Sequence, residues 1–203
     1  ISRFTIRNSG KNPTYYPPLS GIILYSSRGT KISDTVILNN LMGIGIFYSS
    51  DITLENNNVS RNTYNFGVDG DSLGDFIHDI DASNTVDGKP IYYWVGEHNK
   101  QVPSDAGYVA VVNSTNIVVK DLYLTKNFEG VLFASTINSS IENVNASDNY
   151  FGIYLKHSNN NTAHSNAPIN NYFGLLLEKS NNSTVYNTIA LNNTYGINVQ
   201  RSG

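Results

Sequence analysis

A repeat of 22 residues constrains this chain more than any other feature of its sequence. Four glycines mark it, in the hexapeptides FEGVLF, YFGIYL, YFGLLL and TYGINV: Gly130, Gly152, Gly174 and Gly196. Three polar registers keep the same interval: Asn116, Asn138, Asn160 and Asn182; Asn127, Asn149, Asn171 and Asn193; and Ser114, Thr136, Ser158 and Ser180. A period of this length indicates a solenoid of stacked units.

The residues within each unit favour strands over helices. Apolar residues alternate with others after each glycine, as at Ile153 and Leu155, and this alternation is typical of strands. Asn, Ser, Thr and Gly are poor in helix interiors and frequent in turns. The sequence therefore predicts an all-β fold, a parallel β-helix with about 22 residues in each of roughly nine coils and a rise of about 4.8 Å per coil.

The repeat also predicts what its polar residues and glycines do. Equivalent side chains lie above one another in stacked strands, so the Asn registers are expected to form hydrogen-bonded ladders. Each repeat glycine is expected where the chain turns into a strand, either with positive φ or in close contact with another backbone segment.

The pattern predicts one β-helix domain over residues 1–203. Residues 67–108 depart most from the repeat, so irregular coils are expected there, with a protruding loop near residues 96–107. Because both ends of the chain have strand-like sequence, it is expected to be a fragment of a longer protein.

Composition and missing motifs exclude several classes of function. The net charge is −3 without a cluster of Lys or Arg, which argues against nucleic acid as a partner. The chain has no cysteine and therefore no disulfide or thiolate metal site. Neither a membrane-spanning apolar stretch nor a nucleotide-binding motif is present.

Two segments carry a resemblance to a known family. Residues 84–95 (NTVDGKPIYYWV) and 105–122 (DAGYVAVVNSTNIVVKDL) resemble the NosD-like proteins of the CASH group of carbohydrate-binding proteins and sugar hydrolases. The resemblance covers almost the whole chain. It implies a right-handed, single-stranded parallel β-helix and an extracellular or cell-surface location.

The family's namesake is linked to copper-site maturation, and here the sequence departs from the family. Copper prefers Cys, Met and His ligands, whereas this chain has one methionine, Met42, and no cysteine. Its four histidines fall in different registers of the repeat: His78, His98, His157 and His164. We therefore predict no copper site.

An acidic run is the first candidate site. Its residues lie between positions 69 and 81 in a chain otherwise sparing with charge: Asp69, Asp71, Asp75, His78 and Asp79. Carboxylates on the outside of a β-helix can serve as an acid/base pair in polysaccharide cleavage, with His78 as a base. Asp69, Asp71 and Asp75 can alternatively hold calcium. The competing interpretation is that they cap turns and keep the surface soluble.

Aromatic residues form the second candidate site. Alternation along a strand places Tyr92 and Trp94 on one face and Tyr93 on the other. Exposed rings of this kind bind sugars, whereas buried ones fill the core of a distorted coil; both interpretations stay open.

An apolar stripe is the third candidate. If Ile153 and Leu155 point inward, Tyr154 points outward as a candidate ligand-binding residue. The proposed stripe contains Ile23, Ala110, Leu132, Tyr154 and Leu176. It is either exposed for a partner or for self-association, or covered by the N-terminal loop, Gly10–Ser20.

Several Asn-x-Ser/Thr sequences fit the glycosylation pattern. Asn58, Asn145 and Asn192 are the preferred candidates. Asn138, Asn160 and Asn182 belong to a stacked register, so their amides are expected to be buried.

These observations favour an extracellular or cell-surface module that is not an enzyme. It would bind a polysaccharide, a cell-surface glycan or another surface protein, or contribute to a surface layer or adhesin. The alternative is a polysaccharide lyase or glycoside hydrolase that uses the acidic cluster. Such an enzyme needs two or more acids on one outer face, within about 5–10 Å of each other.

Overall fold

The computed structural model describes residues 1–9 and 20–203. Short strands recur in it at equivalent positions of successive coils. Strand registers pair residues 22 positions apart, such as Val131 with Ile153 and Ile153 with Leu175. The predicted parallel β-solenoid is thus confirmed, with about eight turns where roughly nine were expected. No helix in the described ranges is long and apolar enough to span a membrane.

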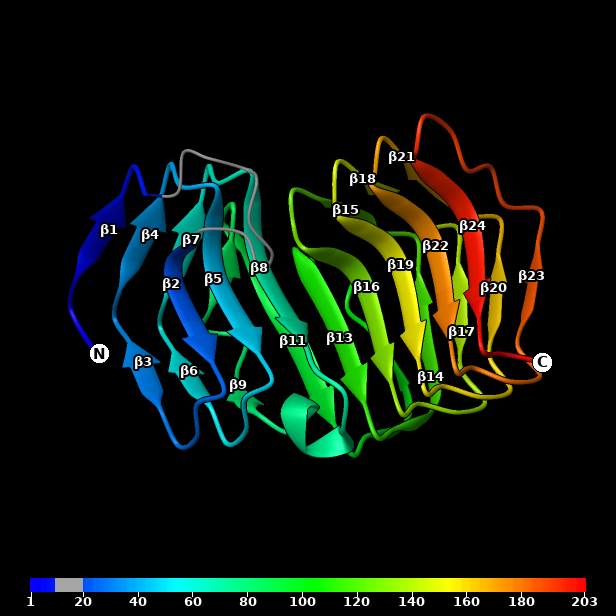
Figure 1. The fold of residues 1–203 in the computed structure, drawn as a ribbon, viewed down its shortest axis with the longest axis horizontal. Coiled ribbons are helices and arrows are strands. Elements are labelled where there is room, and N and C mark those ends of the chain that lie inside the picture. Colours follow the sequence, from blue (N-terminus) through cyan, green and yellow to red (C-terminus); the bar gives the residue numbers. More distant parts are fainter. Residues whose placement is uncertain (10–19) are drawn as a thin grey trace.

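The strands form five sheets (Figure 1). The longest has ten strands: β1 (Thr5–Arg7), β4 (Val36–Leu38), β7 (Asn58–Ser60), β10 (Thr85–Val86), β11 (Lys89–Val95), β13 (Tyr108–Val112), β16 (Glu129–Ala134), β19 (Phe151–Lys156), β22 (Phe173–Glu178) and β24 (Tyr195–Gln200). A second has five: β12 (His98–Gln101), β14 (Thr115–Lys120), β17 (Ser140–Glu142), β20 (Thr162–His164) and β23 (Thr184–Tyr186).

The other three sheets have three strands each. The first contains β15 (Tyr123–Thr125), β18 (Asn145–Ser147) and β21 (Ala167–Ile169). The second contains β2 (Ser20–Tyr25), β5 (Met42–Phe47) and β8 (Tyr64–Asp69). The third contains β3 (Lys31–Ser33), β6 (Thr53–Glu55) and β9 (Asp79–Ile80). One short 3₁₀ helix, η1 (Leu73–Phe76), follows β8.

A hairpin divides the coils into two stacks. β10 pairs antiparallel with β11, through Thr85 with Pro90 and Val86 with Lys89, while the other strand pairs of the described chain are parallel. Its turn residues, Asp87 and Gly88, both have positive φ, as a two-residue hairpin requires. Residues 1–9 and 20–86 belong to the first stack (blue to teal in Figure 1) and residues 89–203 to the second (green to red). The strand β12 lies within the stretch where a protruding loop was expected.

Asparagine side chains connect the coils at one corner. The backbone N–H of Asn149 donates to Oδ1 of Asn171 at 2.8 Å, and Nδ2 of Asn171 donates to the carbonyl of Ala146 at 2.9 Å. Asn127 donates in the same way to Asn149. Each buried amide thereby satisfies backbone groups that the corner leaves without strand partners. The predicted ladder is confirmed in this register.

The second Asn register is different from what the sequence predicted. Asn138, Asn160 and Asn182 are exposed, with φ of 52°, 57° and 53°. Asn tolerates this left-handed conformation better than most residues, so these positions are corners that point outward. Their predicted burial was wrong, and they are as exposed as Asn58 and Asn192, whereas Asn145 is half-buried.

Close packing explains the repeat glycines. A Cβ atom on Gly152 would lie 2.5 Å from the carbonyl oxygen of Gly174 and 2.9 Å from Cβ of Pro168. Because Gly152 is not among the residues with positive φ, the second expected reason, close contact with another backbone segment, is the one that applies.

The ten-stranded sheet has apolar residues on both faces within the second stack. Val131 and Ile153 belong to that stack's own core, while Leu132 and Tyr154 join a cluster with Phe66 and other core residues of the first stack. The predicted stripe is therefore buried at Ala110, Leu132, Tyr154 and Leu176, and only Ile23 is exposed. Of the two alternatives for this stripe, the exposed surface does not apply at the four buried positions, because the first stack packs near this face. Residues 10–19 of the loop considered as an alternative cover lie outside the described residues.

Candidate functional site

The two stacks meet where β8 approaches the start of β16. The backbone N–H of Asn65 donates to the carbonyl of Lys126 at 2.6 Å, and that of Phe128 donates to the carbonyl of Phe66 at 2.8 Å. Gly67 permits this approach, because a Cβ atom there would lie 2.2 Å from Cβ of Phe128. The contact fixes the position of one stack against the other.

Buried charges add a second connection between the stacks. Nζ of Lys156 lies 3.0 Å from Oδ1 of Asp69 and 3.6 Å from Oε2 of Glu178. Burial lowers the pKa of Lys156, but the neighbouring carboxylates, Asp69 first and then Glu178, together raise it by more, so the net direction is upward. The hydroxyl of Tyr154 donates to Glu178. Asp69, on β8, is therefore part of an ion pair that joins the stacks.

A buried glutamate lies in the same interface. Glu129 is fully buried, and Oε2 accepts a hydrogen bond of 2.9 Å from the hydroxyl of Tyr108. Burial, followed by the nearby charge of Asp69, raises the pKa of Glu129 well above its ordinary value. Both effects favour the protonated form of Glu129, which avoids a second buried negative charge.

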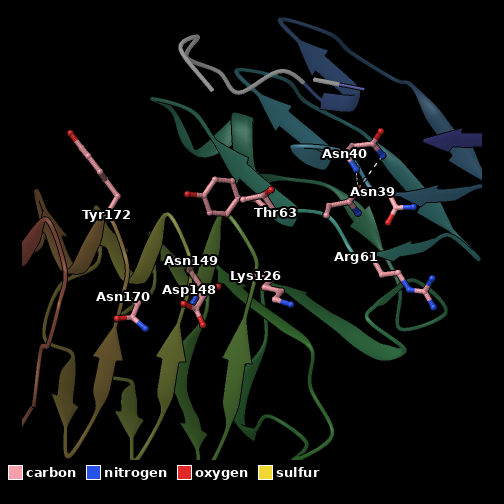
Figure 2. Close-up of a pocket in the computed structure, with 11 residues that line it drawn as sticks. Asn39, Asn40, Arg61, Thr63, Lys126, Asp148, Asn149, Asn170 and Tyr172 are labelled. Carbon is pink, nitrogen blue, oxygen red and sulfur yellow. Dashed lines mark hydrogen bonds between the residues drawn. The ribbon is translucent and has the colours of Figure 1, made fainter. Parts of the chain in front are cut away.

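An open groove of about 790 Å³ lies at the junction of the stacks (Figure 2). Residues of both stacks line it: Asn39, Asn40, Arg61, Asn62, Thr63 and Tyr64 from the first, and Lys126, Asp148, Asn149, Asn170 and Tyr172 from the second. Amides and hydroxyls predominate among these side chains, with two cations and a single carboxylate.

Both walls of the groove use the same backbone corner. Arg61 on the first stack, and Lys126 and Asp148 on the second, have φ of 56°, 58° and 57°. Each is followed by an Asn whose amide is buried in a ladder. Because the ladder Asn fixes the corner, the preceding residue is free to vary and is exposed to the groove.

A row of tyrosines runs along the groove. Tyr150 stacks on Tyr172, with ring centroids 4.9 Å apart, and meets Tyr64 of the first stack edge-on at 6.2 Å. Tyr172 is 40% exposed. Burial raises the pKa of Tyr150 to about 12, so its hydroxyl is neutral over the physiological range.

The structure separates the acidic residues that the sequence grouped. Asp69 is buried beside Lys156, whereas Asp71 and Asp79 are exposed. Oδ2 of Asp75 accepts hydrogen bonds from the backbone of Asp71 and Ser72, and the bonds from Ser72 outweigh burial and lower the pKa of Asp75. No group of three His, Asp or Glu residues suited to a metal ion occurs in the described part of the chain. Asp69, Asp71 and Asp75, considered as calcium ligands, therefore do not form such a group.

His78 is buried at the end of the first stack. Nδ1 accepts a long hydrogen bond, 3.4 Å, from the backbone N–H of Ile52, and Nε2 has no partner among the described residues. Burial lowers its pKa from 6.5 to about 4. His78 is thus a neutral core residue at physiological pH.

Acid is therefore expected to destabilise the fold through His78. The folded pKa lies below the unfolded one, so the unfolded state binds the extra proton between pH 6.5 and about 4. Stability is fully present above pH 6.5 and lost as the pH falls through this window. Relative to His78→Gln, we expect the wild type to lose about 2–3 kcal/mol between pH 7 and pH 4.

Urea unfolding of both proteins at the two pH values measures this difference. The control is His98→Gln, because His98 is exposed on β12 and should leave the acid response of the wild type unchanged. Parallel pH profiles for the wild type and His78→Gln would contradict the prediction.

The predicted aromatic site lies away from the groove. Tyr92 and Trp94 share a face, with ring centroids 6.3 Å apart, and both are half-buried. Lys100 lies over the Trp94 ring at 5.6 Å. Tyr93 points to the other face, is buried and donates a hydrogen bond to the carbonyl of Phe76. Tyr154, the other predicted ligand-binding residue, is buried between the stacks.

The sequence analysis did not identify the groove. Its cations and tyrosines occupy ordinary repeat positions and become neighbours only because the chain reverses between the stacks. The signal for that reversal was present in the sequence, since the Asp87-Gly88 pair is a hairpin turn motif.

Comparison with known proteins agrees with the fold. A family model described as periplasmic copper-binding protein (NosD) matches residues 80–203, more than half of the chain. The chain belongs to the NosD family. No curated protein and no solved structure matches it.

Copper binding, which the description of the NosD family includes, does not fit the residues of this member. Met42 is fully buried. His98 is exposed on β12, and His164 stacks on Tyr186 with Glu142 3.8 Å away. Because the described residues form no group of three potential ligands, we assign no role to copper.

Proposed function

We propose that this NosD-family chain is an extracellular or cell-surface module that binds carbohydrate in the groove between its two stacks. The observation that carries the proposal is the lining of that groove. Asn amides and tyrosine rings from both stacks surround an open volume of about 790 Å³. The periplasmic location in the family's description supports a place outside the cytoplasm.

The groove offers both kinds of contact that a sugar ring needs. Side-chain amides such as those of Asn39 and Asn170 carry donors and acceptors that suit hydroxyl groups. The exposed ring of Tyr172 offers an apolar face with a polar tip. The ladder residues Asn40 and Asn171 fix the backbone of these corners, and Tyr172 stacks on Tyr150, so the backbone and the ring are already placed before binding.

The lining supports binding more than cleavage. Polysaccharide hydrolysis canonically uses two carboxyl groups about 5–10 Å apart, and Asp148 is the one acidic residue among the described lining residues. Asp69 and Asp75, from the predicted catalytic cluster, are held in an ion pair and in a turn. We therefore do not extend the enzyme hypothesis to the groove.

Removing the exposed tyrosine is expected to weaken glycan binding. In Tyr172→Ala the groove loses the face of one ring, which should cost about 1–2 kcal/mol, or roughly five- to thirtyfold in Kd. A panel of oligosaccharides would first identify a ligand, and calorimetry would then compare the proteins.

Two further variants locate the site. Tyr123→Ala removes a 55% exposed tyrosine from β15, outside the groove, and should bind like the wild type. Trp94→Ala tests the other aromatic pair. If Trp94→Ala abolishes binding while Tyr172→Ala does not change it, the ligand binds at the aromatic pair and the groove proposal is wrong.

A further inference from the structure

Two cations line the groove, one from each stack. Arg61 belongs to the first stack and Lys126 to the second; both are exposed, and neither forms an ion pair with a described residue (Figure 2). Asp148 carries the one negative charge among the described lining residues, so these residues together carry two positive charges and one negative, a net +1. The whole chain, in contrast, has a net charge of −3.

One acidic side chain that contacts the Arg61 backbone is already engaged. Asp87, in the hairpin turn, accepts hydrogen bonds of 2.8 Å from the backbone N–H of Arg61 and from Nδ2 of Asn65. These bonds hold the carboxylate on the backbone of the corner. The guanidinium of Arg61 is left with its five N–H donors available to a ligand.

Backbone conformation does not explain why Arg and Lys occupy these two corner positions. Arg61 and Lys126 have left-handed φ, a conformation that Asn adopts at less cost. The equivalent corners at Asn39, Asn170 and Asn192 have asparagine. Arg and Lys therefore occupy the two positions next to the junction although Asn would suit the backbone better.

We propose that the groove binds acidic glycans, with sugar carboxylates paired to Arg61 and Lys126. This inference rests on the proposed carbohydrate-binding function. A planar guanidinium binds a carboxylate through two parallel hydrogen bonds, and a lysine ammonium provides a compact charge on the facing wall. The tyrosine row lies alongside to contact the sugar rings, so the ligand class is an oligosaccharide that carries uronic acids.

The test compares one oligosaccharide in two charge states. The probes are a galacturonate hexamer and the same hexamer with its carboxyl groups methyl-esterified. We expect the free acid to bind at least tenfold more tightly than the ester, and its binding to weaken as salt is raised. The proteins are the wild type, Arg61→Asn and Lys126→Asn, whose new residue suits the left-handed corner.

Arg201→Asn is the matched control, because Arg201 is also exposed with left-handed φ, 51°, but lies outside the groove. Each groove variant should weaken binding of the free acid at least fivefold and leave binding of the ester unchanged. Arg201→Asn should change neither. Circular dichroism and thermal unfolding verify that all variants are folded.

Each other outcome overturns a defined part of the argument. Equal binding of acid and ester, still lowered by Tyr172→Ala, would refute the acidic specificity and leave the carbohydrate groove intact. A loss in Arg201→Asn as large as in Arg61→Asn would reduce the effect to general charge and also refute it. If a sulfated hexasaccharide that lacks carboxyl groups bound more tightly than the galacturonate hexamer, the choice of carboxylate as the recognised group would be overturned. Failure of the whole oligosaccharide panel to bind would refute the proposed function itself.

Discussion

Replacing Lys156 with methionine is expected to destabilise the protein by about 3–5 kcal/mol. Lys156 is 5% exposed and lies 3.0 Å from Asp69, with Glu178 at 3.6 Å. Methionine keeps much of the side-chain volume but removes the positive charge that offsets two carboxylates in a region of low dielectric. Chemical unfolding at neutral pH measures the loss.

Two further variants separate this effect from the loss of any lysine. Lys31→Met removes a surface ion pair, since Lys31 and Glu55 are both exposed in their 2.7 Å contact, and should leave the unfolding midpoint unchanged. The double variant Lys156→Met with Asp69→Asn should recover part of the lost stability, because it also removes a negative charge. If Lys156→Met were no more harmful than Lys31→Met, the buried pair would not be what holds the stacks together.

Replacing Gly152 with alanine is expected to cost about 3–4 kcal/mol. The new Cβ atom would lie 2.5 Å from the carbonyl oxygen of Gly174 and 2.9 Å from Nδ2 of Asn171. The first of these is backbone of the next coil, and the second belongs to the buried ladder, so neither can move without separating coils. Thermal and urea unfolding measure the change.

The repeat itself supplies the control for this prediction. Gly196 occupies the same register two coils further on, but a Cβ atom there would have Cβ of Ala190 at 3.8 Å as its nearest neighbour, an ordinary contact. Gly196→Ala should therefore be neutral or slightly stabilising. Equal effects of the two substitutions would mean that coil-to-coil contact is not the reason for the glycine.

Periodic features were the part of the fold that the sequence could predict. The alternation at Ile153 and Leu155, the ladder at Asn149 and the need for glycine at Gly152 all depend on contacts between residues about 22 positions apart. Successive coils repeat these contacts, so the residues that form them recur at a fixed interval and can be recognised in the sequence. The same reasoning failed for Asn160, because the period reveals that residues stack but not whether the stack points inward.

Contacts between the stacks have no such period. Lys156 and Asp69 are 87 positions apart, and Glu129 and Val68 are 61. Each of these contacts occurs once, so no recurring pattern in the sequence predicts it. These contacts depend on the hairpin at Asp87 and Gly88, which lies in the stretch for which the sequence predicts irregular coils.

The sequence by itself determined the parallel coil, its period and the residues that form ladders, because these follow from local strand geometry repeated along the chain. Tertiary structure alone decided which outer faces are covered. Contact between the two stacks buries Tyr154 and Leu176, places Asp69 beside Lys156, and brings Arg61 and Lys126 to one groove. The physical reason is that a β-helix fixes side-chain direction coil by coil, whereas contact between two stacks depends on a single change of chain direction.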